Sequence, residues 1–349
     1  MPRPLHALML VGSYTTPGLA ELSALYARGC EAALAGAVRF TTLHRSPGGD
    51  WRVVDRLDDL ATAPGLSLDA ALAGVAARRP DIGLPQMFCP PGMTEGRELF
   101  SRLGVPLIGN PADVMAIATD KARTRDAVAA RGVDVPDAVR LPQSATVGVD
   151  VPVASLPNLP VVVKPVTGDN SDGLRFVGAP RDLADAIAQS QHFGDVLVER
   201  FIPAGREVRC GVLEWDGHLR PLPMEEYPVS DEHPVRTRAD KLRRDDGRLT
   251  LAAKTQDAAW IVGPDDPDTP AVQAAALAAF RALGCRHYGL FDFRIDPSGK
   301  VWFLEASLYC SFSPQSVLVA MASADGITLP ELLEGLAGTA LNHPSATAA

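Results

Sequence analysis

The chain has 349 residues, of which 46% are hydrophobic, so it can bury a sizeable core, and its length predicts two or three packed subdomains. The formal net charge of -9, with acidic and basic residues interspersed, argues against a nucleic-acid partner because phosphate neutralisation needs a basic surface. The five cysteines are far apart and include no C-x-x-C pair, which indicates neither a disulfide framework nor a zinc site and favours a reducing cytoplasm.

The first third of the chain alternates apolar strands with helices rich in alanine and leucine. The run Leu5 to Gly12 is too short for a membrane span and has no small-residue cleavage pattern, so we expect a buried strand, no membrane partner and a cytoplasmic location. The alternation is typical of a parallel sheet with crossover helices, which predicts an N-terminal parallel α/β domain over residues 1–118. The expected elements are strands at 7–12, 38–43 and 81–88 and helices at 20–35 and 68–79.

The pattern then changes. Thr119-Asp120 offers an N-cap for a helix over 121–131, and Gly132 ends it. From Pro160 onward, shorter alternating strands predict antiparallel or mixed sheets. We therefore expect a central subdomain over 119–204 and a C-terminal subdomain over 205–349. The expected strands are 161–164, 174–177, 196–201, 207–214 and 219–223.

The C-terminal part contains a long charged segment, residues 227–250, which predicts a surface loop that closes as a lid. A helix is expected over 269–283, followed by a hairpin about the turn Pro297-Ser298-Gly299. The remaining expected elements are hairpin strands at 287–295 and 301–306 and helices at 315–324 and 329–336.

Two carboxylates of this hairpin suggest a metal site. A two-residue loop would place Asp292 opposite Glu305 on one face, whereas a three-residue loop without a bulge would place them on opposite faces. Facing carboxylates repel unless a cation lies between them, and oxygen ligands without His or Cys favour Mg²⁺. The hairpin alone leaves open the alternative of solvated acidic residues on an exposed strand.

Lys164 ends the apolar strand 161–164, and a lysine there is costly to bury unless it meets an anion. The loop after it contains Gly168, Ser171 and Gly173 and can turn backbone N–H groups toward phosphate oxygens. It is neither a Walker A sequence nor a dinucleotide fingerprint. A plain hairpin with the lysine at its wet end is the alternative.

A third pattern is the apolar strand 196–202, which breaks into a polar linker before Glu207. Such a linker can present backbone groups to a flat base, and a carboxylate after it can bind ribose hydroxyls. By themselves, Glu199 and Glu207 are more readily explained as surface carboxylates.

The order of these patterns resembles the ATP-grasp superfamily, and within it the D-alanine–D-alanine ligase branch of the carboxylate-amine ligases. The resemblance runs from about Val105 to Leu336. It rests on the segments G-V-P-L-I-G-N, T-D-K-A-R-T-R, G-V-D-V-P, V-V-V-K-P, N-S-D-G, V-L-V-E-R-F-I, G-R-E-V, Phe291-Asp292-Phe293 and F-L-E-A-S. It implies an α/β (α+β) ATP-grasp fold that holds ATP between the central and C-terminal subdomains, and it implies a homodimer.

The resemblance also assigns roles to individual residues. It implies that Lys121 and Lys164 contact the ATP phosphates and that the loop around Ser171 covers them. It implies that Glu199 and Ile202 meet adenine and that Glu207 holds ribose. The implied magnesium site is formed by Asp292, Glu305 and Ser307.

Several positions depart from the family pattern. Ser307 stands where the family has a metal-binding asparagine, and Leu290 stands where it has an arginine that stabilises the tetrahedral oxyanion. Arg294, or one of the lid arginines Arg236, Arg238 and Arg243, is a candidate replacement. Lys241 is a candidate lid contact to phosphate.

The N-terminal region also lacks a clear match to the family's substrate glutamate, for which Glu21 is a loose counterpart. We therefore predict an ATP- and Mg²⁺-dependent ligase that joins a small carboxylate to an amine through an acyl phosphate, with substrates other than those of cell-wall dipeptide synthesis. The alternatives are ring closure within one substrate, phosphorylation without ligation, and a nucleotide-binding protein without activity.

Overall fold

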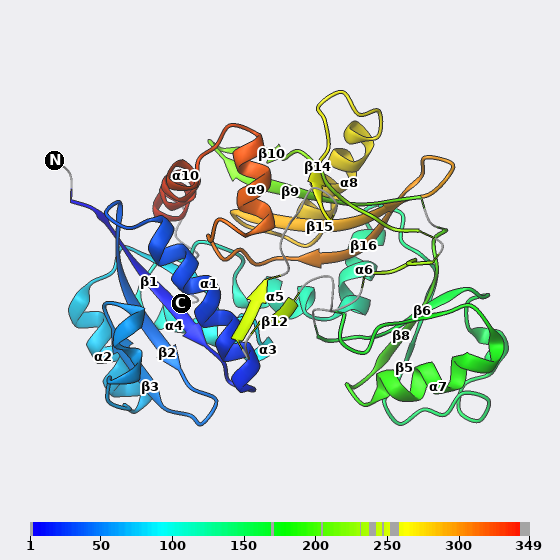
Figure 1. Ribbon diagram of the computed structural model, residues 1–349, viewed down its shortest axis with the longest axis horizontal. Helices are drawn as coiled ribbons and strands as arrows, with labels where there is room; N and C mark the ends of the chain where they lie inside the picture. Colours follow the sequence, from blue (N-terminus) through cyan, green and yellow to red (C-terminus); the bar gives the residue numbers. More distant parts are fainter. Residues whose placement is uncertain are drawn as a thin grey trace.

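The computed structural model describes residues 3–168, 171–203, 205–230, 232–236, 242–245, 248–251 and 258–342. In the described residues, three larger sheets follow one another along the chain, and β12 and β13 form a separate two-stranded sheet (Figure 1). Their strand orders are β3-β2-β1-β4, β5-β8-β6-β7 and β14-β11-β9-β15-β16, with β10 paired to β9 in the third sheet. This mixed architecture agrees with the predicted fold class. The exact boundaries between the three predicted segments stay a prediction.

The N-terminal sheet consists of β1 (Leu5–Gly12), β2 (Val38–Arg45), β3 (Trp51–Val54) and β4 (Ile82–Pro85). β1 pairs in parallel with β2 and β4, as expected. The sequence analysis did not predict β3, which runs antiparallel to β2 at one edge of the sheet. Only five residues, 46–50, join these two strands, which is too short for the crossover that a parallel pair needs.

Helices cover both faces of this sheet, which explains why β1 is apolar throughout. Side chains alternate between faces along a strand. Met9 and its neighbours pack toward α1 and α10, whereas Leu8 and its neighbours pack toward α2 and α4. The helices of this region are α1 (Pro17–Ala33), α2 (Leu68–Arg78), α3 (Pro90–Met93), α4 (Glu95–Leu103) and α5 (Ala112–Ala118).

The central sheet is antiparallel and has its own small core. Its strands are β5 (Ala138–Leu141), β6 (Val161–Pro165), β7 (Arg175–Val177) and β8 (Val196–Arg200), accompanied by α6 (Lys121–Ala129) and α7 (Pro180–Gln191). Val161 and Val163 pack against α7. Val162 and Lys164 point to the opposite face, which is turned toward the C-terminal sheet.

The C-terminal sheet divides one of its faces between core and site. Its elements are β9 (Arg206–Trp215), β10 (His218–Pro221), β11 (Glu225–Tyr227), β14 (Trp260–Ile261), α8 (Thr269–Ala282), β15 (Tyr288–Ile295), β16 (Val301–Ser307), α9 (Val317–Ala324) and α10 (Leu329–Asn342). Val208, Cys210 and Val212 pack under α8. On the other face, Leu213 and Leu290 belong to the core formed with α9 and α10. Charged residues of β9 and β15 continue this face beyond the core, and they form part of the site.

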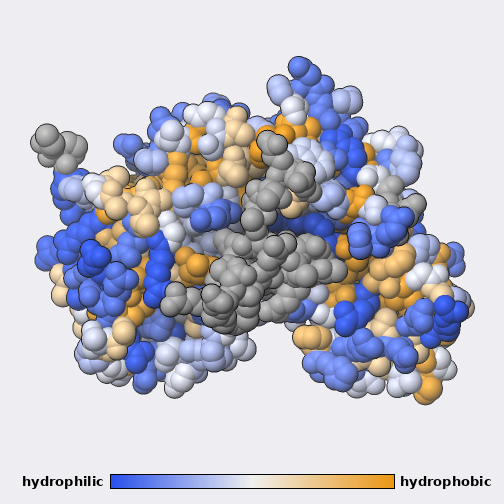
Figure 2. All heavy atoms as spheres, viewed as in Figure 1, coloured by the Kyte–Doolittle hydropathy of each residue, from blue (hydrophilic) through white to orange (hydrophobic). Residues whose placement is uncertain are grey.

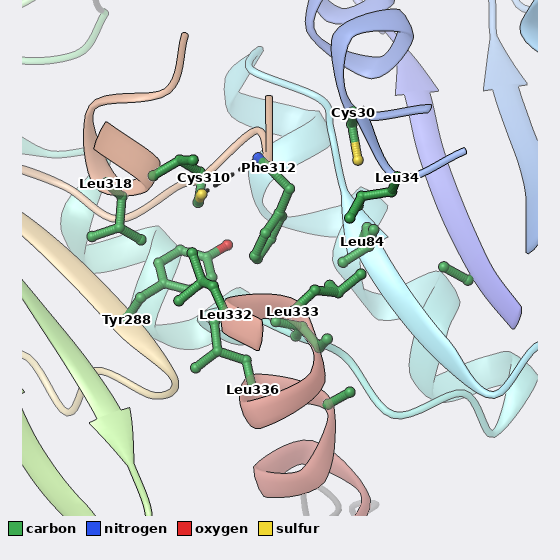
Figure 3. Packing of buried hydrophobic residues seen from close by; sticks show 14 of the residues in the cluster. Cys30, Leu34, Leu84, Tyr288, Cys310, Phe312, Leu318, Leu332, Leu333 and Leu336 are labelled. Atoms are coloured by element: carbon green, nitrogen blue, oxygen red, sulfur yellow. Dashed lines mark hydrogen bonds between the residues drawn. The ribbon is translucent and has the colours of Figure 1, made fainter. Parts of the chain in front are cut away.

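One hydrophobic core joins the first and last parts of the chain. Figure 3 shows Leu34, which follows α1, and Leu84 of β4 between Cys30 of α1 and the α10 residues Leu332 and Leu333. All five cysteines are buried and unbridged.

In the described part of the chain, no helix has the length and apolar character to cross a membrane. On the face shown in Figure 2, hydrophobic residues lie among hydrophilic ones.

The segment 227–250 is not simply a loop, contrary to prediction. It begins with the end of β11 and includes β12 (Leu242–Asp245), which pairs with β13 (Arg248–Leu251) in a short antiparallel hairpin. The backbone of β13 approaches α1. The sequence analysis missed this hairpin because its two short strands carry no long apolar alternation, and hydrogen bonding between backbones does not require one. Lys241, Arg238 and the other residues of 237–241 lie outside the described residues.

Candidate active site

Asp292 of β15 pairs directly with Glu305 of β16. The turn between the strands spans residues 296–300, and the register shifts between Asp292 and Phe293, where β16 carries one extra residue, Leu304. The bulge places Leu304 and Glu305 in succession toward one pocket, while Phe303 points into the core. The condition that the sequence set for a metal site, two carboxylates facing each other, is met through this bulge.

The neighbouring strand completes a charged surface. Arg209 and Glu207 of β9 lie directly opposite Asp292 and Arg294 of β15, so each pair joins opposite charges across the strands. Both Nε and Nη2 of Arg209 donate to Asp292, the Nη2 bond at 2.8 Å. Arg294 donates from Nη2 to Glu207, and Arg236 donates to the same carboxylate at 2.6 Å.

The pKa values reflect this pairing. Burial alone would raise the pKa of Glu207, but the Arg236 and Arg294 guanidinium groups outweigh it and hold the pKa below its usual value. Burial likewise opposes the charge of Arg209, yet the Asp292 carboxylate raises the pKa of Arg209 well above its ordinary value. Both groups are therefore charged at neutral pH.

The central sheet supplies a second set of charges. Lys164, the last residue but one of β6, is almost fully buried, and its Nζ lies 3.0 Å from Glu199 Oε1 on the adjacent β8. Arg125 of α6 donates to the other oxygen of Glu199, also at 3.0 Å. The two cations Lys164 and Arg125 share the single negative charge of Glu199. The net charge of this group is therefore positive, which suits an anionic ligand.

Lys121 links the two sheets. It is the first residue of α6, capped by Asp120 as predicted, and its backbone N–H donates to Val166 at the end of β6. Its Nζ lies 3.1 Å from Glu305 and donates to the carbonyl of Gly168. Lys121 therefore holds the loop after β6 beside the metal-site carboxylate.

A pocket lies between the two sheets and gathers most of the residues that the sequence indicated. The predicted residues that line it are Lys164, Ser171, Glu199, Ile202, Glu207, Asp292, Arg294 and Glu305. Its apolar lining includes Val162, Leu174 and Leu304. Apolar side chains together with carboxylates and cations in one pocket match the needs of a nucleotide.

A larger cavity of about 390 Å³ adjoins this pocket. Lys121, Glu305 and Ser307 line it together with Thr16 of the loop between β1 and α1. Glu305 is thus shared between the two cavities. The N-terminal lining was missed by the sequence interpretation, although ligands of open parallel sheets commonly bind at the carboxyl ends of the strands, where Thr16 lies.

Of two candidate residues, one does not line the larger cavity and the other lies outside the described residues. Arg294 lines the nucleotide pocket and donates to the carbonyls of Ile202 and Pro234, at 3.3 and 3.0 Å. Lys241 lies outside the described residues. Arg209 was not singled out from the sequence, although charges alternating with Val208 and Cys210 on one strand were a usable signal.

The residues present fit a magnesium ion. Asp292, Glu305 and Ser307 offer only oxygen atoms, which suits a hard divalent ion. Within the described ranges, no group of three or more His, Cys, Asp or Glu side chains could hold a metal by itself. A metal ion here therefore needs phosphate oxygens as further ligands, which is typical of nucleotide-bound Mg²⁺.

The comparisons with known proteins agree with this geometry. The family model described as D-ala D-ala ligase C-terminus matches residues 130–337. The D-alanine–D-alanine ligase of Mycolicibacterium vanbaalenii is 34% identical over 300 residues, which cover 81% of this chain and 77% of that protein. The chain belongs to the D-alanine–D-alanine ligase family. It is an ATP-dependent ligase that forms a carbon–nitrogen bond between small molecules, and it uses ATP and Mg²⁺.

Other members of the family extend the comparison. The D-alanine–D-alanine ligase of a Polaromonas species is 30% identical over 272 residues, covering 76% of this chain and 75% of that protein. Among solved structures, the D-alanine–D-alanine ligase of Coxiella burnetii has a TM-score of 0.75 at 22% identity and covers 97% of this chain and 94% of that one. The D-Ala:D-Ser ligase of Enterococcus faecalis has a TM-score of 0.73 at 19% identity and covers 97% and 100%. The ATP-grasp fold is thereby confirmed.

These relatives contradict one functional prediction. The sequence was interpreted as a ligase for substrates other than those of the cell-wall enzyme, but relatives up to 34% identical over most of the chain carry the name D-alanine–D-alanine ligase. The prediction was wrong because it gave weight to single positions. In the structure, Leu290 packs in the core shared with Leu318 and Met321 of α9, so its apolar character has a packing reason.

Proposed function

We propose that this protein joins two molecules of D-alanine, with ATP as the energy source, and so supplies a dipeptide for the cell wall. The names of its relatives support this substrate. The observation that carries the proposal is the position of Glu305, which faces Asp292 across the strands and borders both the nucleotide pocket and the adjoining cavity. A carboxylate substrate in that cavity would lie next to the phosphates.

The first chemical step is proposed to be phosphoryl transfer. Lys121 and Lys164 neutralise phosphate charge, and a D-alanine carboxylate oxygen attacks the γ-phosphorus, which releases ADP and leaves an acyl phosphate. Bound Mg²⁺ supplies further charge neutralisation to the phosphates. The loop around Ser171 covers the phosphates, and Gly168 of that loop accepts a hydrogen bond from Lys121.

The second step is aminolysis. The amine of the second D-alanine attacks the acyl carbonyl, and the tetrahedral species collapses with loss of inorganic phosphate. The segment 227–250, including Lys241, is proposed to exclude water from the acyl phosphate, because hydrolysis would waste the intermediate. Arg294 stays a candidate for charge stabilisation, acting from the nucleotide side of the site.

The nucleotide base and sugar are proposed to bind at the other end of the pocket. Ile202 and Glu199 would meet adenine, and Glu207 would hold the ribose hydroxyls. Arg236 and Arg294 each donate to one oxygen of Glu207, and the remaining lone pairs of the carboxylate would accept from the ribose hydroxyls. Asp292, Glu305 and Ser307 are the proposed metal ligands.

Two broader predictions accompany this function. A cytoplasmic location is proposed because the substrate ATP and the five unbridged cysteines both suit a reducing, nucleotide-rich compartment. The homodimer implied by the family resemblance stays a prediction. Size-exclusion chromatography with light scattering measures the mass that decides it.

The deciding experiment is a coupled measurement of ADP release and dipeptide formation by the purified full chain. With Mg²⁺, ATP and D-alanine, we expect stoichiometric ADP, phosphate and D-alanyl-D-alanine. L-alanine at the same concentration serves as the control and should give neither dipeptide nor excess ADP. Absence of D-alanine-dependent ADP release, with the protein folded and binding ATP, would refute the proposed function.

A further inference from the structure

Arg209 has no assigned role in the reaction described above, yet it is the residue most tightly bound to the metal-site carboxylate Asp292. It lies directly opposite Asp292 on β15 and directly opposite Glu225 on β11. Its side chain is only 14% exposed and makes a two-bond contact with the Asp292 carboxylate. Such planar pairing is the strongest form of ion pair available to arginine.

The surroundings hold Arg209 in place. The Glu225 carboxylate attracts it from the far side, and the Tyr227 ring centre lies 5.6 Å from its guanidinium carbon. Separation from Asp292 would leave a buried charge without its partner, which is strongly unfavourable. Binding of nucleotide is therefore expected to leave this pair intact.

Glu305 differs in this respect. Its side chain is 31% exposed, and its partner Lys121 comes from α6 at the edge of the central sheet, 3.1 Å away. A lysine ammonium on a flexible stem can turn from Glu305 toward a phosphate and leave the carboxylate to a metal ion. Of the two facing carboxylates, Glu305 is thus the one that can exchange its cation.

We propose that the site works with a single Mg²⁺, bound mainly through Glu305 and the nucleotide phosphates, because the Arg209 guanidinium already neutralises Asp292 and leaves no favourable position for another divalent cation beside it. Asp292 retains lone pairs that Arg209 leaves unused and contributes to that one ion. A second divalent ion beside Asp292 would meet the fixed guanidinium charge at short range. Ser307 would bind such a second ion only weakly, because its hydroxyl is shorter than the amide side chain of the asparagine found at this position in the family. This inference rests on the proposed ATP site.

The test is the number of Mn²⁺ ions bound per chain in the presence of the nonhydrolysable analogue AMP-PNP, with free Mn²⁺ measured by electron paramagnetic resonance. The wild-type protein should bind one ion tightly. Arg209→Met should bind two, whereas Arg209→Lys, which keeps the charge, should bind one. Arg220→Met is the matched control, because Arg220 lies on β10, away from the site, and pairs with Asp325 at the end of α9. This variant should bind one ion.

Two tightly bound ions in the wild-type protein would overturn the proposal, as would a single ion in a folded Arg209→Met variant that still binds AMP-PNP. Where Arg209→Met fails to fold, the wild-type and Arg209→Lys counts decide: one ion in each supports the proposal, and two in either overturns it. Failure of the wild-type protein to bind AMP-PNP at all would remove the ATP site itself, an outcome distinct from a wrong ion count.

Discussion

Asp292 lies directly opposite Glu305 because Leu304 is an extra residue in β16. In a regular hairpin continuing the register of Phe293 and Phe303, Asp292 would pair with Leu304 instead. Because of the bulge, two consecutive residues line the site. Leu304 is part of the apolar lining of the nucleotide pocket, and Glu305 faces Asp292.

Replacement of Leu304 with alanine should therefore weaken nucleotide binding without changing the dependence on Mg²⁺. The lost apolar contact with the base corresponds to about 1–2 kcal/mol, or roughly a tenfold rise in the Kd for ATP. Isothermal titration calorimetry with AMP-PNP measures this change. Leu341→Ala is the control, because that side chain is largely exposed on α10. An unchanged Kd in the Leu304 variant would show that the base binds elsewhere.

Lys164→Met and Glu305→Gln should each lower kcat by at least about 100-fold, because one removes phosphate neutralisation and the other a metal ligand. The circular dichroism spectra should match the wild-type spectrum, since each change keeps the size of the side chain. Lys300→Met is the control. Lys300 lies in the turn of the hairpin and pairs with Asp134, which follows α6. Wild-type rates in either site variant would refute the assignment of the site.

Ser307→Asn tests the third metal ligand. The longer amide oxygen reaches further toward the ion, so the Mg²⁺ concentration at half-maximal activity should stay equal or fall. A rise would contradict ligation by Ser307. Ser311→Asn, in the loop that follows β16, is a control for the general effect of added volume.

His44 should make the stability of the fold pH-dependent. Burial, with a smaller contribution from Arg52, lowers the pKa of His44 to about 4, so the folded protein keeps this ring neutral. In the unfolded chain the ring takes a proton below about pH 6.5. The unfolded state therefore binds more protons between pH 4 and 6.5. Stability is complete above that range and falls as the pH decreases, by at most about 3 kcal/mol.

The comparison of His44→Gln with the wild-type protein isolates this contribution. Their difference in the free energy of unfolding, from urea titrations at pH 4.5 and 7.5, should be smaller at the lower pH. His218→Gln is the control, because that ring is exposed on β10. A constant difference across the pH range would show that His44 does not titrate as described.

Local patterns in the sequence predicted much of the fold. Cap residues placed the start of α6 at Lys121, and alternation placed β9 and β15 within one or two residues. Order along the chain also brought Lys164, Glu199 and Glu207 to one pocket. These features depend on near neighbours in sequence, which is why they can be read from it.

Features set by distant contacts were not predicted. The bulge at Leu304 depends on the pairing of two strands, and the pairing of Arg209 with Asp292 joins residues 83 positions apart. The packing environment of Leu290 was not predicted for the same reason. Its environment comes from α9, which follows it in the chain and packs over it.

The shared core of α1, β4, α9 and α10 has a mechanical consequence. Because that core ties the N-terminal sheet to the C-terminal sheet, the two should move as one rigid body. The central sheet has a separate core around Val161 and α7 and faces the rest mainly through polar contacts such as that of Lys121 with Glu305. Entry of ATP and release of ADP should therefore occur by a hinge motion, in which the central sheet moves relative to the N-terminal and C-terminal sheets.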